Sequence, residues 1–275
     1  MIGAIAGDII GSRYEFHNIS NDDFPLFEKK STFTDDSVLT VATADVILDN
    51  AQYDKYYYDY ATSFPNRGYG GRFGQMLRMG ALKPYNSYGN GSAMRVSPIG
   101  WVYDLYADGE YVKALEEAKR SAECTHDHPE GIKGAQAVVS AIYFARSQAS
   151  KEDIKKVVEL LGYDLSKKSS ELGRTFDETC QGTIPKCMAI FLETDDYESS
   201  IRKSIAMGGD VDTIACIVGG ISQAYYGMPS REIVEEVYRK LPVHMAKIIT
   251  KFTQKYIDSG FVEPKEIATD GAANL

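Results

Sequence analysis

Two acidic clusters, far apart in the sequence, have the residue types that bind cations. Each combines aspartates with a threonine, and the residues are Thr34, Asp35 and Asp36 in FTDDSVLT and Asp210, Asp212 and Thr213 in GGDVDT. Each cluster stands at the start of a predicted apolar helix, where Thr34 is a suitable N-cap and acidic residues interact favourably with the helix dipole. Capping explains one aspartate of the second cluster, but not two together with the parallel set upstream.

Taken together, the two clusters offer four carboxylates and two hydroxyls. If the two helix starts converge, the carboxylates repel each other strongly unless cations lie between them. Oxygen ligands without histidine or cysteine suit Mg²⁺, Mn²⁺ or Ca²⁺ better than Zn²⁺. Four carboxylates are enough for two divalent ions, so the clusters predict a two-metal site provided that the helices meet.

Three better-known acidic motifs fit this sequence poorly. An isoprenoid-synthase DDxxD motif would need an acidic residue at the position of Leu39. A DxDxT phosphatase motif should follow a hydrophobic strand, whereas IRKSIAMGG before Asp210 is typical of the end of a helix. An EF-hand would need a glycine and a distal glutamate that neither cluster supplies.

Three further stretches could contribute chemistry. The polar loop NSYGNGSAMR (86–95) has backbone N–H groups and hydroxyls that could hold a phosphate, although such loops are usually only turns. THDHPEG (125–131) could bind a metal, but a substrate contact or a plain helix N-terminus fits better, because no third ligand is nearby. Glu15 follows an apolar helix, where partial burial would raise its pKa towards a general acid or base role; otherwise it is a solvated charge.

The elements that must position these residues are predicted to be helices. Apolar residues recur at helical spacing, clearly in 35–50, 132–148 and 230–241, and no segment alternates as a strand does. Turn-forming residues divide the chain into segments that hold one or two helices each. This pattern predicts an all-α protein, a bundle of roughly ten or more helices.

Small residues mark the expected centre of this bundle. Gly3, Gly7 and Gly11 share one helix face, where each glycine costs roughly 1 kcal/mol relative to alanine unless close packing compensates. A similar stripe, Ala215, Gly219 and Gln223, follows the second acidic cluster. No linker or repeat is visible, so we expect one domain over 1–265 and a fraying tail over 266–275.

Composition excludes several classes of protein. The 275-residue chain has a formal charge of −9, which argues against a nucleic-acid partner. Its four cysteines form no CxxC pair, and free thiols in a reducing cytoplasm are expected. No basic segment precedes the N-terminal apolar stretch, which Asp8 interrupts, so neither a signal peptide nor a membrane span is predicted.

The order of these motifs gives a family resemblance. GDIIGSRYEF, TDDS, SYGNGSAMR, THDHPEG and GGDVDT, between about residues 2 and 230, closely resemble the ADP-ribosylglycohydrolase family. The resemblance implies a compact all-α single domain, an orthogonal bundle, with a binuclear Mg²⁺ or Mn²⁺ centre at the bottom of a cleft. One departure is Ser37, where many members have threonine, and the hydroxyl is retained.

The resemblance also implies roles for individual residues. Thr34, Asp35 and Asp36 would bind one ion and Asp210 the other, with Asp212 bridging them and Thr213 completing the set. The diphosphate of ADP-ribose would be held by the loop residues Ser87, Tyr88, Gly89, Asn90 and Gly91, and His126 would face the ligand. Glu15 matches an acidic residue near the scissile bond, and Glu15, Asp36 or Asp212 would manage the proton.

The function implied is hydrolysis of the glycosidic bond between ADP-ribose and a modified protein side chain, arginine or serine. Two alternatives stay open: hydrolysis of small conjugates such as O-acyl-ADP-ribose, and a non-catalytic ADP-ribose-binding relative. The presence of all four aspartates argues against loss of activity. We expect a cytoplasmic monomer whose partner is its ADP-ribosylated substrate.

Overall fold

The computed structural model describes residues 1–264, so the predicted tail 266–275 lies outside it. Its helices are α1 (Ile2–Gly11), α2 (Asp35–Asp49), α3 (Tyr53–Ser63), α4 (Gly71–Arg78), α5 (Gly91–Met94), α6 (Ile99–Val102), α7 (Glu110–Glu123), α8 (Pro129–Arg146), α9 (Lys151–Leu160), the 3₁₀ helix η1 (Ser169–Glu171), α10 (Cys180–Glu193), α11 (Tyr197–Met207), α12 (Val211–Tyr226), α13 (Arg231–Lys240) and α14 (Val243–Tyr256). Within the described residues, the β-structure consists of an isolated bridge between Gly89 and Thr179. The predicted all-α fold is confirmed.

The three helices with the clearest apolar spacing lie where the sequence predicts them. The segment 35–50 forms α2, 132–148 lies almost entirely within α8, and 230–241 contains α13. Of the described helices, none is long and apolar enough to span a bilayer. All four cysteines are free, as expected.

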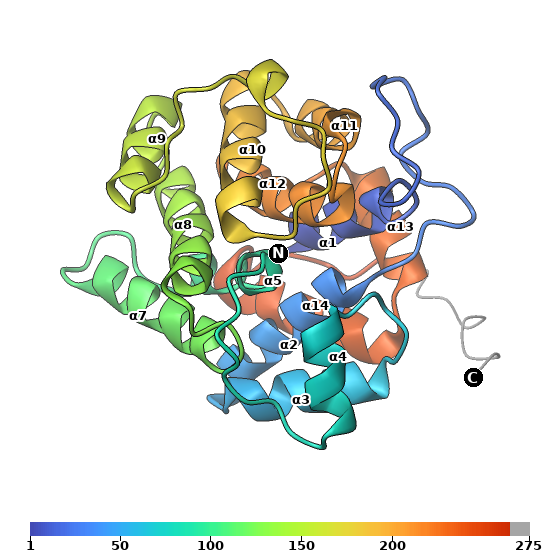
Figure 1. Cartoon of the computed structure of the whole chain (residues 1–275), viewed down its shortest axis with the longest axis vertical. Helices are drawn as coiled ribbons and strands as arrows, with labels where there is room; N and C mark the ends of the chain where they lie inside the picture. Colours follow the sequence, from blue (N-terminus) through green and yellow to red (C-terminus); the bar gives the residue numbers. More distant parts are fainter. Residues whose placement is uncertain (265–275) are drawn as a thin grey trace.

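Helices α1 and α12 form the centre of the bundle. They pack against each other, and α8, α10 and α11 pack around α12 (Figure 1). Every residue of α1 is buried, and so is α12 from Val211 to Ala224. The two predicted small-residue stripes therefore lie in the core, where they face each other.

The glycines of α1 bring the two backbones into contact. A Cβ on Gly3 would lie 2.5 Å from the Gly219 carbonyl oxygen, and one on Gly7 would overlap the Ala215 carbonyl. At the other end, a Cβ on Gly11 would overlap the Asp212 backbone. The helices are thus antiparallel, and the C-terminal end of α1 is held at the acidic N-terminal end of α12.

Candidate functional site

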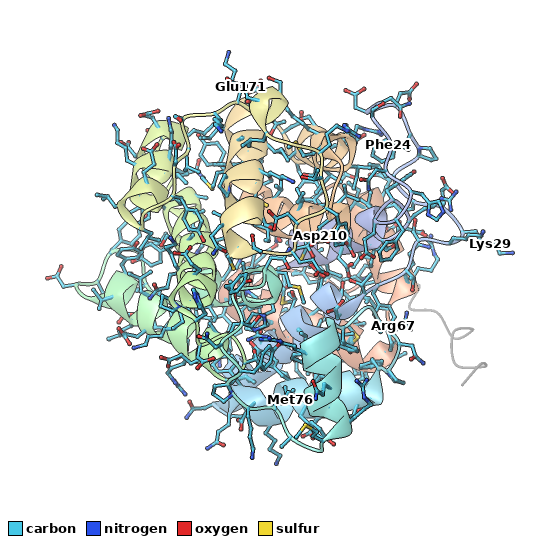
Figure 2. The ribbon with its side chains drawn as sticks, viewed as in Figure 1. Phe24, Lys29, Arg67, Met76, Glu171 and Asp210 are labelled. Atoms are coloured by element: carbon cyan, nitrogen blue, oxygen red, sulfur yellow. The ribbon has the colours of Figure 1, made fainter. Side chains whose placement is uncertain are left out.

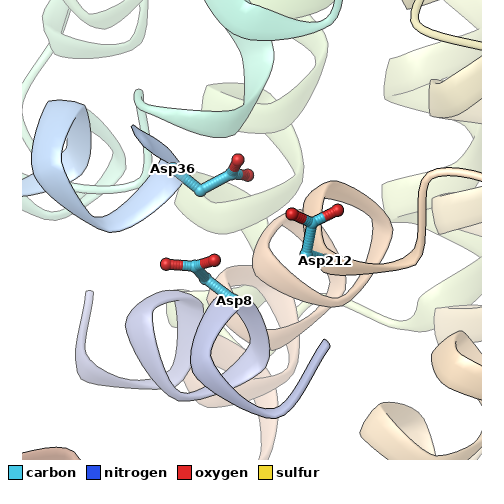
Figure 3. Close-up of side chains that lie close together, drawn as sticks. All are labelled: Asp8, Asp36 and Asp212. Carbon is cyan, nitrogen blue, oxygen red and sulfur yellow. The ribbon is translucent and has the colours of Figure 1, made fainter. Parts of the chain in front are cut away.

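Three carboxylates from three helices meet at the centre of the bundle. Asp8 comes from α1, Asp36 from the first turn of α2 and Asp212 from the first turn of α12, and all three side chains point towards one another (Figure 3). They are buried, and one oxygen from each lies within 4.8 Å of the others. The convergence of the two helix starts, on which the predicted cation site depends, is confirmed.

A second acidic group shares Asp212. It consists of Glu15, Asp210 and Asp212, again with one oxygen from each within 4.8 Å of the others. Gly208 and Gly209, at φ values of 73° and 88°, make the sharp turn that places Asp210 just before α12. Figure 2 shows Asp210 near the middle of the molecule. Asp212 therefore belongs to both groups, the position expected of a bridging ligand.

Asp8 organises the first cluster, although the sequence showed it only as a charge that interrupts an apolar stretch. Its Oδ1 accepts a hydrogen bond from Thr34 Oγ1 at 2.6 Å. Its Oδ2 accepts bonds from the amides of Thr34 at 3.0 Å and Ser37 at 3.1 Å, and from the Ser37 hydroxyl. One carboxylate on α1 thus caps the start of α2. The available signal was a buried-looking charge inside a glycine-rich apolar helix.

Threonine hydroxyls complete the cluster. Thr34 is the N-cap of α2, as predicted, and Thr213 Oγ1 donates to Asp36 Oδ2 at 3.3 Å across the two helix starts. The other oxygen of Asp36, Oδ1, is buried and has no hydrogen-bond partner within residues 1–264. A buried carboxylate oxygen without a donor is costly, and a cation would satisfy it. The residues present therefore suit hard divalent ions.

The electrostatics of the site lead to the same conclusion. Burial raises the pKa of Asp36 well above its usual range, and the charges of Asp8 and Asp35 add to the shift. Burial, then the charges of Asp210 and Asp36, raise the pKa of Asp212 in the same way. Burial also raises the pKa of Asp8, despite its four hydrogen bonds. These groups must share protons or bind cations to remain together near neutral pH.

Asp35 lies beside the cluster and not in either three-carboxylate group. Its side chain lines the adjoining cavity, and its backbone N–H donates to the Arg67 carbonyl at 2.8 Å. Burial and the charge of Asp8 raise the pKa of Asp35 well above its usual range.

A cavity of about 280 Å³ adjoins the carboxylates. It is lined by most of the residues predicted from sequence, namely Glu15, Asp35, Asp36, Ser87, Gly89, Asn90, Gly91, His126, Asp210, Asp212 and Thr213. Tyr88 is not among the lining residues. It is 47% exposed, and its ring packs edge-on against the His128 ring, with 5.2 Å between the ring centroids. Its role in ligand binding stays a prediction.

The loop that carries Ser87 to Gly91 is tied to the acidic centre. Asn90 Nδ2 donates to Asp210 Oδ2 at 2.7 Å and to Thr183 Oγ1 at 3.0 Å. The Asn90 backbone N–H donates to the Glu178 carbonyl at 2.7 Å, beside the Gly89–Thr179 bridge. These hydrogen bonds therefore join the loop to Asp210 of the second acidic group and to the segment before α10.

Glu15 and the two histidines of THDHPEG take distinct places. Burial, followed by the charge of Asp210, raises the pKa of Glu15 to about 7, in line with the expected acid or base role. His128 is the N-cap of α8, where its Nδ1 accepts from the Glu130 amide at 3.1 Å. His126 is buried and lines the cavity. The motif thus combines a helix start with a cavity residue.

Sequence reasoning missed several residues that line the cavity. They are Leu39, Gly68, Gly70, Gly71, Arg72, Phe73, Tyr85, Met94, Arg95 and Glu178. Five of them lie in the turn before α4 or in its first helical turn, and a turn-forming sequence such as NRGYGG gives no sign of what it faces.

Comparisons with known proteins agree with this architecture. Residues 1–259 match the family described as ADP-ribosylglycohydrolase. The protein named ADP-ribosylhydrolase ARH3 from Mus musculus is 27% identical, with 83% of each chain aligned, and that from Homo sapiens is 26% identical over 83% of this chain and 84% of the relative. A solved structure titled "ADP-ribosylglycohydrolase-related protein complex" has the same fold, with a TM-score of 0.69 at 20% identity, covering 94% of this chain and 97% of that one. The chain belongs to the ADP-ribosylglycohydrolase family.

Proposed function

We propose that this protein is a metal-dependent hydrolase that cleaves the glycosidic bond between ADP-ribose and a modified protein side chain, arginine or serine. The observation that carries the proposal is the convergence of Asp8, Asp36 and Asp212 beside a cavity that is lined by Asp36, Asp212 and most of the Ser87–Gly91 loop. The names of the relatives, ADP-ribosylhydrolases, support the same reaction class.

The cofactors in this proposal are two divalent ions, Mg²⁺ or Mn²⁺. Their ligands would be Thr34, Asp35 and Asp36 for one ion, Asp210 for the other, and Asp212 shared, with Thr213 completing the set. Bound ions would supply Lewis acidity and offset the negative charge of the carboxylates. Asp8 is not a proposed ligand in this scheme, because its four hydrogen bonds to the start of α2 already use both oxygens.

The protein side chains have separate tasks in the reaction. The Ser87–Gly91 loop would hold the diphosphate through the Ser87 hydroxyl and through loop N–H groups other than those of Gly89 and Asn90, which already donate within the protein. Positive charge develops on the anomeric carbon as the glycosidic bond breaks, and the buried carboxylates would stabilise it. Glu15, with a pKa of about 7, can gain and lose a proton near neutral pH, which suits proton transfer to or from the reacting groups.

One activity panel tests this proposal. Purified protein would be incubated with arginine-linked, serine-linked and O-acyl-linked ADP-ribose, with Mg²⁺ or Mn²⁺, and released ADP-ribose measured. We expect cleavage of a protein linkage, and a loss of about 100-fold or more in Asp36→Asn and Asp212→Asn, typical of removing a catalytic interaction. Asp45→Asn, on the same helix as Asp36 but bonded to Tyr60, is the matched control.

The outcomes separate the remaining possibilities. Cleavage of the ester alone would indicate a hydrolase of small conjugates. Stabilisation by ADP-ribose in a thermal shift assay, without turnover of any substrate, would indicate a binding protein. Undiminished turnover in both aspartate variants would contradict the metal assignment. The monomeric state and cytoplasmic location inferred from sequence stay predictions.

A further inference from the structure

Among the residues that the structure describes, Arg95 is a buried arginine without an acidic partner. It is 0% exposed, and no ion pair joins it to a residue of the described range. Its guanidinium carbon lies 4.2 Å from the centre of the Tyr57 ring, and its Nε and Nη1 have no hydrogen-bond partner. Buried arginines are normally paired, so this one needs a specific explanation.

The third guanidinium nitrogen of Arg95, Nη2, donates a hydrogen bond to Thr125, the residue before His126. Arg95 Nη2 donates to the Ser121 carbonyl at 2.7 Å and to Thr125 Oγ1 at 3.0 Å. The Thr125 hydroxyl in turn lies 2.7 Å from His126 Nδ1. Arg95, Thr125 and His126 therefore form a continuous buried chain that ends at the cavity.

The direction of these hydrogen bonds determines where the His126 proton lies. A guanidinium only donates, so the Thr125 oxygen accepts from Arg95 and its own proton needs another acceptor. His126 Nδ1 is that acceptor, because the competing group near the hydroxyl, the Cys124 sulfur, accepts weakly. If Nδ1 carried the proton instead, the fully buried hydroxyl would lack a good acceptor, which costs about 1–3 kcal/mol.

The other ring nitrogen of His126 faces the glycine loop. A Cβ on Gly91 would lie 3.1 Å from His126 Nε2, and one on Gly89 would lie 3.5 Å from it. No hydrogen bond joins Nε2 to any residue that the structure describes. The imidazole thus has one nitrogen bound within the protein and one available to a ligand in the cavity.

We propose that Arg95 and Thr125 are positioning residues that hold His126 as a neutral imidazole with its proton on Nε2, so that Nε2 donates to a phosphate or ribose oxygen beside Gly89 and Gly91. The identity of that ligand oxygen rests on the proposed function; the tautomer does not. Burial, with the charge of Arg95 as the second cause, lowers the pKa of His126 well below its usual value. The positive charge of Arg95 therefore disfavours a protonated, positively charged His126 ring. Its hydrogen bond to the Thr125 oxygen leaves the Thr125 hydroxyl proton to point towards His126 Nδ1.

The tautomer can be measured directly in the ligand-free protein. The two ring nitrogens of a neutral imidazole have widely separated ¹⁵N chemical shifts, and long-range ¹H–¹⁵N correlation spectra show which one carries the proton. His126→Gln assigns the His126 signals among the four histidines. We expect wild-type His126 to carry its proton on Nε2 and to stay neutral as the pH falls to about 5.5, below the ordinary histidine value. A proton on Nδ1, or an ordinary titration, would overturn the proposal.

Two substitutions at Thr125 test the link to Arg95. Thr125→Val keeps the shape but removes the hydroxyl, so we expect a mixed tautomer and roughly five- to tenfold weaker binding of ADP-ribose by calorimetry, the effect of one neutral hydrogen bond. Thr125→Ser should restore both readouts. Thr250→Val on α14, which removes a buried hydroxyl bonded to Tyr238 of α13, controls for general destabilisation.

The possible results are distinguishable. An unchanged tautomer and affinity in Thr125→Val would overturn the positioning role. If Thr125→Val fails to fold, the wild-type spectrum and the Thr125→Ser variant still decide the tautomer. A wild-type protein with the proton on Nε2 that does not bind ADP-ribose would support the positioning role and contradict the proposed function.

Discussion

Gly7 of α1 and Ala215 of α12 are in backbone contact, because a side chain on residue 7 would overlap the Ala215 carbonyl. Asp8 follows Gly7 by one residue and Asp212 precedes Ala215 by three, so this contact holds the helices of the two carboxylates close together. Gly7→Ala should therefore destabilise the protein by roughly 3 kcal/mol in urea unfolding and weaken metal binding. Gly74→Ala in α4, where a Cβ makes only an ordinary contact at 3.6 Å, should change stability by less than about 1 kcal/mol. Equal stability of the two variants would show that α1 and α12 are not in close contact.

Asp8 positions the start of α2 through four hydrogen bonds from Thr34 and Ser37. Asp8→Asn replaces one accepting oxygen with an NH₂ group that faces donors. We expect a 10- to 100-fold loss of Mn²⁺ affinity, the usual effect of removing a residue that orients ligands, measured by electron paramagnetic resonance titration. Asp45→Asn, the same substitution at a buried aspartate of α2 that is bonded to Tyr60 and lies outside the acidic cluster, should leave Mn²⁺ affinity unchanged. Unaltered affinity in Asp8→Asn would remove Asp8 from the site.

The buried carboxylates predict how metal-free stability depends on pH. A carboxyl whose pKa is higher in the folded state than in the unfolded state binds more protons when folded. Its contribution to the free energy of unfolding is therefore lost as the pH rises from the unfolded-state pKa to the folded-state pKa. The pKa values of Asp36 and Asp212 are raised well above the ordinary value, and that of Glu15 to about 7. With a chelator present, the melting temperature should therefore fall between about pH 5 and pH 8.

Divalent ions should reverse this loss. Protons and cations compete for the same carboxylates, so Mg²⁺ or Mn²⁺ should raise the melting temperature more at high pH than at low pH. At 100 times its dissociation constant an ion adds about 2.7 kcal/mol per site. Asp212→Asn should reduce this gain. A chelated protein that becomes more stable as the pH rises would contradict the predicted linkage.

Glu15 is the carboxylate best suited to proton transfer. Its pKa of about 7 results from burial and the nearby charge of Asp210. Glu15→Gln should lower kcat by about 100-fold or more, as loss of a general acid or base does, while calorimetry shows ADP-ribose binding within a few-fold of wild type. Glu116→Gln, an exposed residue of α7, provides the control for a lost negative charge. Full turnover in Glu15→Gln would assign the proton to one of the aspartates.

Much of the site could be predicted from sequence because its cues are local. Thr34 beside two acidic residues marks a helix start, and Asp210 and Asp212 repeat the pattern after a glycine pair. Two such starts with excess charge imply a shared counterion only if they meet, and the structure confirms that they do. The glycine spacing of α1 similarly predicted close packing, but it did not indicate that α12 is the helix that packs against α1.

Only the tertiary structure shows the partners of Asp8, Arg95 and Tyr88. Asp8 bonds to residues 26 and 29 positions away, and Arg95 bonds to residues 26 and 30 positions away. Sequence patterns that relate neighbouring residues cannot predict hydrogen bonds between residues this far apart in the chain. The loop sequence likewise contains Tyr88 without showing that its ring packs on His128, outside the cavity lining. Helix periodicity and capping are properties of neighbouring residues, so the sequence determined the helices and the acidic helix starts. The meeting of three helices at one carboxylate cluster depends on packing between distant segments, so only the folded chain decided which charges share a site.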